Sequence, residues 1–140
     1  MPLLANDTSG ALTRKRVETW AAKMEKVTVV AATDAATVQV AATLAAAQQV
    51  VYTMTPTATR TLTTPTGAEL GAAFTDEAVG SSFEFTVVNG AATTHAITLT
   101  AGASGVTLGG VAGMATIAAA SSASFVAVFT AANTVTIYRK

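Results

Sequence analysis

The clearest pattern of apolar and polar positions lies in the second half of the chain, in the stretch SSFEFTVVNGAATTHAITLTAG at 81–102. Phe83 and Phe85 alternate with polar residues, and Ile97 and Leu99 repeat the alternation after an intervening loop. Because successive side chains of a strand point to opposite faces, this pattern predicts two strands that each bury one face.

The loop between these strands begins with Asn89 and Gly90, and both residues tolerate the positive φ that tight turns require. We therefore expect the two strands to form a hairpin. The residues AATT that follow make the loop longer than the ideal hairpin turn, so the register stays undetermined.

Short runs rich in Val and Thr predict most of the remaining strands, because β-branched side chains favour the pleated backbone. These runs are 27–33, 37–44, 48–54, 105–110, 114–120, 123–130 and 134–139. The segment 57–63 lies between Pro56 and Pro65, and since proline donates no hydrogen bond to a ladder, it fits an edge strand. Many short strands with frequent turns indicate an all-β fold, an antiparallel β-sandwich or jelly-roll-like domain.

One short helix is expected within this domain, at TGAELGAAF, residues 66–74. Thr66 stands three positions before Glu69, which is the spacing of a capping box. In that motif each side chain satisfies a backbone N–H of the first helical turn. Leu70 and Phe74 give the helix an apolar face.

Residues 1–26 differ in character from the rest and predict an N-terminal arm before a single β-domain at 27–140. Trp20 and Met24 share one face of a short helix, which is marginal in water when isolated. The arm is therefore expected to bind a neighbouring subunit. An ordinary terminal helix packed on its own domain is the alternative. The segment 27–60 stays open between edge strands and an extension of the arm.

The composition of the chain indicates that part of its surface faces a partner. Hydrophobic residues make up 51% of the chain and charged residues 11%, whereas about 25% charged residues is usual in soluble domains. The chain has no cysteine, which excludes disulfides and thiolate metal sites. Arg14, Lys15 and Arg16 form a basic cluster in the arm, but no Lys or Arg occurs between Arg60 and Arg139. The arm and the domain therefore differ in charge.

The residues that could carry chemistry do not form a recognisable set. His95 is the only histidine, and no serine stands in a nucleophile elbow. One histidine and scattered carboxylates give no metal-ligand pattern, and no motif indicates a cofactor. We expect no catalytic residues, no cofactor and no metal. His95 is then a loop or strand-start residue, and Glu84 faces solvent or a subunit contact.

Two classes of partner are also not expected. Nucleic acid is disfavoured because the β-region has almost no basic residues with which to follow phosphates. A membrane is disfavoured because no stretch of about 20 residues is uninterruptedly apolar. A protein partner is left as the main expectation.

From residue 60 onward the chain resembles a β-module of tailed-bacteriophage virion proteins. The resemblance rests on the order of TPTGAEL, VGSSFEFTVVN, HAITLTAG, GVTLGG and MATIAAASSASFVAVFTAANTVTIYR. Such modules look like capsid decoration (cement) proteins, head fibres or the β-rich tips of tail fibres. The resemblance implies a small β-sandwich or jelly-roll-like domain that assembles as a homotrimer on the capsid exterior, without catalytic residues.

Together these observations predict a non-enzymatic virion structural protein, a capsid decoration protein that binds the outside of the shell and reinforces it. It would be made in the host cytoplasm, be carried on the capsid exterior, and have the major capsid protein as its partner. Arginine and aromatic side chains commonly anchor interfaces. The expected interface residues are Arg14, Lys15, Arg16, Trp20 and Met24. The alternative is a tail-fibre or head-fibre module that binds a host cell-surface glycan.

Overall fold

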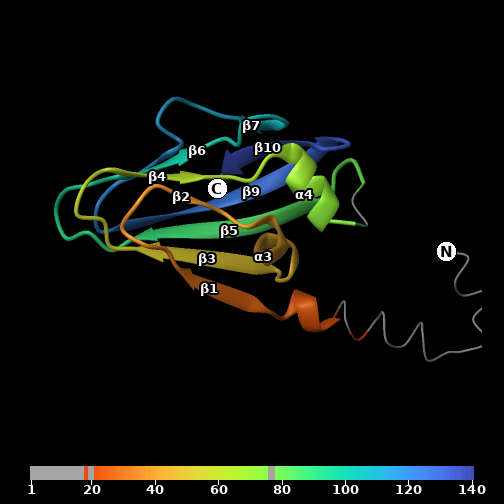
Figure 1. The fold of residues 1–140 in the computed structure, drawn as a ribbon, viewed down its shortest axis with the longest axis horizontal. Coiled ribbons are helices and arrows are strands. Elements are labelled where there is room, and N and C mark those ends of the chain that lie inside the picture. The colour runs from red at the N-terminus through yellow and green to blue at the C-terminus, as the bar shows by residue number, and fades with distance from the viewer. Residues whose placement is uncertain (1–17, 19–20, 76–77) are drawn as a thin grey trace, which may run out of the picture.

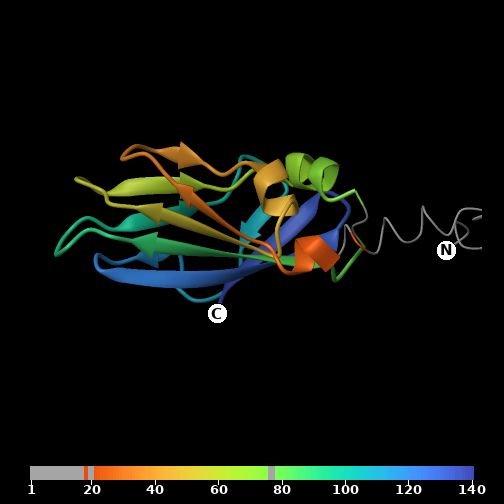
Figure 2. The same ribbon diagram turned by 90° about the horizontal axis from the view of Figure 1, so that it is seen from below.

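The computed structural model describes residue 18 and residues 21–75 and 78–140, which form two stacked β-sheets with short helices at one end (Figures 1 and 2). The six-stranded sheet contains, in spatial order, β1 (Val27–Ala31), β3 (Gln49–Met54), β5 (Ser82–Asn89), β9 (Ser121–Ala131), β10 (Thr134–Arg139) and β7 (Val106–Leu108). The four-stranded sheet contains β2 (Thr37–Val38), β4 (Arg60–Thr63), β6 (Ile97–Thr100) and β8 (Thr116–Ile117).

The chain alternates between the two sheets from β1 to β9, since odd-numbered strands lie in one sheet and even-numbered strands in the other. Among the first six strands, neighbours within a sheet are therefore two strands apart in sequence and run in the same direction. β1, β3 and β5 are parallel, as are β2, β4 and β6. The pairs β5–β9, β9–β10 and β6–β8 are antiparallel, and β7 runs parallel to β10.

The predicted all-β antiparallel sandwich or jelly-roll-like domain with one helix is therefore wrong. The protein is a mixed α/β fold in which both sheets combine parallel and antiparallel pairs. The error comes from the turns, because Gly, Asn and Ser favour any tight reversal, whether the chain stays in one sheet or crosses to the other. β9 and β10 do form a hairpin, with Asn133 at φ 55° in its turn.

The helix predicted at 66–74 is confirmed as α4 (Gly67–Ala73), and its capping box is complete. The backbone N–H of Glu69 donates to Thr66 Oγ1 at 3.3 Å, and the backbone N–H of Thr66 donates to Glu69 Oε2 at 2.7 Å. The bond from the Thr66 N–H, followed by one from the Thr66 hydroxyl to Glu69 Oε2 at 2.8 Å, holds the pKa of Glu69 below its ordinary value.

A further helix, α3 (Ala41–Ala45), stands where the sequence predicted the end of a strand at 37–44. The strand β2 stops at Val38. Alanine has the highest helix propensity, so the alanine-rich run after it favours a helical turn. Leu44 fixes that turn because its side chain is buried in the core.

The segment 27–60 contributes strands to both sheets. β1 and β2 are edge strands, whereas β3 and β4 lie inside their sheets. The edge position expected for 57–63 is therefore wrong, since β4 lies between β2 and β6 and buries Leu62. Residues 21–24 are helical, and the backbone N–H of Gln48 lies 3.0 Å from the carbonyl oxygens of both Lys23 and Lys26.

The core lies between the two sheets. The inward alternation predicted for Phe83 and Phe85 is confirmed, and it continues at Val87. Phe85 stacks on Phe125 with ring centroids 5.1 Å apart. Phe74, which ends α4, stacks on Phe83 at 4.7 Å and so joins the helix to the sheet.

Candidate interaction surface

The six-stranded sheet turns one face away from the core, and this outer face is the largest surface that the described strands share. Side chains alternate along each strand, so every second residue belongs to it. We define the outer face as Val27, Val29, Ala31, Gln49, Val51, Thr53, Ser82, Glu84, Thr86, Val88, Ser122, Ser124, Val126, Val128, Thr136 and Tyr138. Twelve of these sixteen residues are Val, Thr or Ser.

A row of polar side chains crosses the middle of the outer face. Gln49 Nε2 donates to Thr86 Oγ1 at 3.0 Å, and Thr86 Oγ1 and Ser124 Oγ lie 2.8 Å apart. The row links β3, β5 and β9. Because these three side chains already bond to one another, the cost of covering them with a partner is lower than for polar side chains that have no partner.

The outer face carries one charged side chain, Glu84, and that charge is paired. Lys140 Nζ lies 2.9 Å from Glu84 Oε1, with both side chains partly exposed. The sequence left Glu84 open between solvent and a subunit contact, and the structure places it on the outer face. The face is thus close to neutral, a composition that suits contact with an apolar or small polar protein surface.

Of the predicted interface residues, only Met24 lies in the part of the chain that the structure describes. Arg14, Lys15, Arg16 and Trp20 lie outside the described residues. Met24 is exposed and lines a hollow of about 370 Å³ at one end of the outer face, next to Gln49 and Glu84. In the same hollow, Lys23 Nζ lies 5.3 Å from the centroid of the Phe74 ring. The described end of the arm therefore adjoins the outer face.

His95 lies in the turn between β5 and β6, where its side chain is exposed and its φ is 76°. The hairpin expected here is absent, because β5 and β6 belong to different sheets. Within residues 18, 21–75 and 78–140, no group of three or more His, Asp or Glu side chains is close enough to hold a metal ion.

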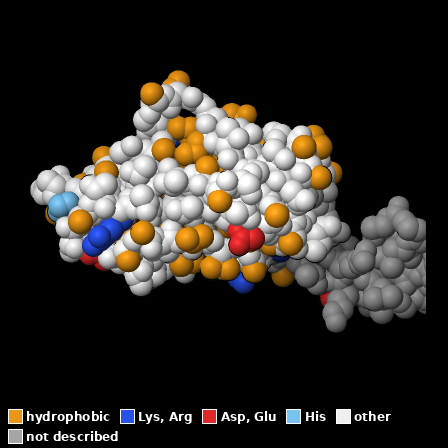
Figure 3. Space-filling model, turned by 45° about the horizontal axis from the view of Figure 1, so that its top comes forward, with side chains coloured by type: hydrophobic (Ala, Val, Ile, Leu, Met, Phe, Trp, Pro, Cys, Tyr) orange, Lys and Arg blue, Asp and Glu red, His pale blue; other side chains and the backbone are white. Residues whose placement is uncertain are grey.

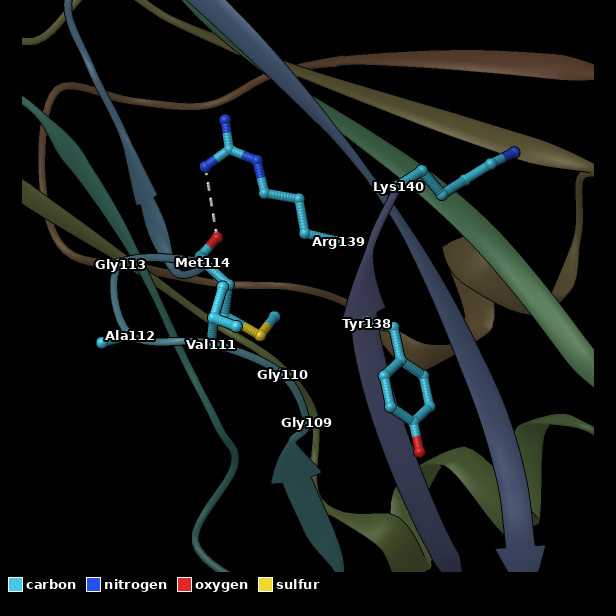
Figure 4. Close-up of a pocket in the computed structure, with 9 residues that line it drawn as sticks. All are labelled: Gly109, Gly110, Val111, Ala112, Gly113, Met114, Tyr138, Arg139 and Lys140. Carbon is cyan, nitrogen blue, oxygen red and sulfur yellow. Dashed lines mark hydrogen bonds between the residues drawn. The ribbon is translucent and has the colours of Figure 1, made fainter.

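A second hollow, of about 510 Å³, lies between the loop after β7 and the end of β10 (Figure 4). Arg139 Nη1 donates to the carbonyl oxygens of Met114 at 3.3 Å and Thr116 at 2.8 Å, which holds the loop in place. Tyr138 is 44% exposed, and a side chain at Gly109 would meet its Cε1 at 2.7 Å. The loop therefore needs glycine there to lie against the ring.

Sequence reasoning missed two polar side chains in the interior, Gln39 and Tyr52. Both are buried, and neither the amide of Gln39 nor the hydroxyl of Tyr52 has a hydrogen-bond partner among the described atoms. Burial raises the pKa of Tyr52 to about 12, and the nearby backbone N–H of Val40 opposes this only in part. In the sequence both residues alternate with apolar neighbours, so the pattern does not mark them as buried polar groups.

The surface has the sparse charge that the composition predicts, and Figure 3 shows few charged side chains among scattered apolar ones. None of the described helices is long and apolar enough to cross a membrane. No family model, curated protein or solved structure matches the chain.

Proposed function

We propose that the chain is a non-enzymatic virion structural protein, a capsid decoration protein of a tailed bacteriophage. The observation that carries the proposal is the outer face, a nearly neutral sheet surface crossed by a row of hydrogen-bonded polar side chains. Such a face suits a permanent protein contact. The assignment to a phage virion rests on the resemblance of residues 60–140 to phage β-modules.

The size of the outer face indicates that it does not act alone. The six strands contain 39 residues in all, and a strand spacing of about 4.8 Å with about 3.3 Å per residue gives them a plan area of about 600 Å². A stable interface buries about 800 Å² on each partner. The arm, residues 1–26, would supply the difference, and Met24 lies beside the face from which it would extend.

In this proposal the partner is the major capsid protein, and the protein occupies the capsid exterior after synthesis in the host cytoplasm. A homotrimer is the assembly implied by the resemblance. Reinforcement follows from mass action, because a ligand that binds only the assembled shell favours the assembled state.

Binding to undecorated particles tests the proposal with three variants. Deleting residues 1–20 removes most of the arm and keeps residues 21–26, which contact Gln48. Val126→Lys adds a charge to the outer face beside Glu84, and Val111→Lys adds the same charge to an exposed loop. We expect the deletion and Val126→Lys to lose occupancy, and Val111→Lys to decorate normally.

Circular dichroism melting of each free variant establishes that the domain is folded. Normal occupancy of the deletion variant would overturn the role of the arm, and normal occupancy of Val126→Lys would overturn the role of the outer face. Saturation with the wild-type protein should also raise the temperature at which the shell opens. An unchanged opening temperature would contradict reinforcement.

A fibre module that binds a host cell-surface glycan is the second candidate, and the hollow beside Tyr138 is the observation that favours it (Figure 4). An exposed aromatic ring next to polar groups suits the apolar face and hydroxyls of a sugar, and Arg139 and Lys140 supply such groups. Titration with host surface oligosaccharides, followed by NMR, should then shift the resonances of this loop, and Tyr138→Ala should abolish the shift. A decoration protein shows many copies per particle, whereas a fibre shows few.

A further inference from the structure

Among the strands that the structure describes, β1 has a row of backbone hydrogen-bonding groups open at the edge of the six-stranded sheet. In a ladder, alternate residues of an edge strand bond to the one neighbouring strand. The N–H of Ala32 donates to the carbonyl of Thr53 at 2.8 Å, so even-numbered residues of this segment face β3. The residues whose N–H and C=O groups point away from the sheet are therefore Val27, Val29 and Ala31.

β1 is also the longest open edge in the described structure. It has five residues, whereas β7 has three and the edges of the other sheet, β2 and β8, have two each. Proteins protect edge strands by keeping them short or by placing Lys or Pro on them. β1 has neither, and Val27 is 54% and Val29 65% exposed.

We infer that β1 pairs with β1 of a second copy of this chain, antiparallel and about a two-fold axis at Val29. Val29 then faces Val29, and Val27 faces Ala31, so the outward N–H and C=O groups of the two strands meet as donors and acceptors. The exposed valines pack against their counterparts on the outer face. The two six-stranded sheets become one continuous sheet.

A second copy fits this edge better than an unrelated partner because the edge complements itself. β1 has no charged side chain that would repel its symmetry mate or select a charged ligand. Isologous pairing also uses every open group of the edge once on each subunit. Both outer faces stay on the same side of the joined sheet and remain free.

The pair is expected to be weak in solution. Joining two five-residue edges buries a total surface well under about 1,200 Å², and interfaces of that size are typical of transient complexes. On a particle surface the high local concentration would favour it. The contact has two-fold symmetry, unlike a trimer interface, and it uses only the β1 edge of the outer face, so the rest of that face can still contact the capsid. Its failure would leave the proposed decoration function untouched.

Sedimentation velocity over a range of concentrations tests the pair with the full chain. We expect wild-type protein to shift towards dimer as its concentration rises. Val29→Lys should raise the dissociation constant at least tenfold, since two lysines would face each other. Val111→Lys adds the same charge at a loop residue that is 80% exposed and should behave as wild type. A monomer at all concentrations, or association that Val29→Lys leaves unchanged, overturns the inference.

Cross-linking gives an independent readout because the chain has no cysteine. A short bismaleimide should join two Val29→Cys chains efficiently. Thr107→Cys, at the exposed centre of the opposite edge strand β7, should remain uncross-linked. Equal yields from the two variants, or a higher yield from Thr107→Cys, would overturn the assignment to β1.

Discussion

The side-chain amide of Asn89 donates a hydrogen bond to the backbone carbonyl of His95 at 2.9 Å, across the turn that carries the chain from one sheet to the other. The same amide nitrogen lies 3.1 Å from the carbonyl oxygen of Ile117 in β8, and Asn89 Oδ1 accepts from the N–H of Ala91 at 3.0 Å. Asn89 is buried, so one side chain joins the turn to the end of the four-stranded sheet.

We expect Asn89→Ala to lower the free energy of unfolding by about 1–3 kcal/mol, because buried backbone groups lose their hydrogen-bond partner. Urea denaturation measures this value. Thr93→Ala changes an exposed residue of the same turn and should stay within about 0.5 kcal/mol of wild type. Equal effects of the two substitutions would show that Asn89 does not hold the turn together.

The sequence predicted where most strands lie but not how they pair, and the β5–β6 turn shows why. Phe83 and Phe85 in β5, like Ile97 and Leu99 in β6, mark strands with one buried face. That pattern is the same whether two strands lie side by side or face each other across the core. Neither Asn89 nor Gly90 adopts positive φ, whereas His95 does. The turn residues therefore favoured a reversal without indicating which sheet would follow.

Tyr52 should tolerate the loss of its hydroxyl. That hydroxyl is buried and unpaired among the described atoms, so Tyr52→Phe removes a desolvation cost and should raise the free energy of unfolding by up to about 1 kcal/mol. Tyr138→Phe, at an exposed tyrosine, should leave it unchanged. Chemical denaturation of both variants gives the comparison. A clear loss of stability in Tyr52→Phe would mean that the hydroxyl is hydrogen-bonded in solution.

Asp34 should make the stability of the protein depend on pH in the acid range. Its carboxylate accepts hydrogen bonds from Arg60 Nε at 2.7 Å and from the hydroxyl and backbone N–H of Thr57. These contacts, that of Arg60 first, hold the pKa of Asp34 well below its ordinary value. The folded pKa is thus lower than the unfolded value of about 3.9, so the contribution is complete above that pH and is lost progressively below it.

Urea midpoints at about pH 7 and about pH 3 measure this effect, and Asp34→Asn is the matched variant because it cannot be deprotonated. We expect the wild type to lose more stability than Asp34→Asn between the two conditions. Equal losses would show that the carboxylate contributes nothing specific in the folded state.

Composition predicted that part of the surface faces a partner, but it could not locate that surface. Thr86 and Ser124 lie 38 residues apart, and only the pairing of β5 with β9 brings their hydroxyls to 2.8 Å. The neutrality of the outer face likewise depends on Lys140 reaching Glu84. Such relationships require the register of the sheet. The basic cluster and Trp20 were visible in the sequence, and their contribution to binding stays a prediction.

Gly67 should not tolerate even a methyl group, although it begins a helix. A Cβ at this position would collide with the carbonyl oxygen of Asn133 in the β9–β10 turn and would lie 2.7 Å from that of Gly105. Helix propensity alone favours alanine over glycine by about 1 kcal/mol, whereas overpacking a tight contact costs about 1–3 kcal/mol or more. Because the obstructing atoms are backbone, we expect Gly67→Ala to lower the free energy of unfolding.

Ala68→Gly, at the exposed next position of α4, is the control, because it changes only the helix propensity. Urea denaturation measures the free energy of unfolding of both variants. If Gly67→Ala instead stabilised the protein by the amount that Ala68→Gly destabilises it, the close packing of α4 on the hairpin turn would be disproved.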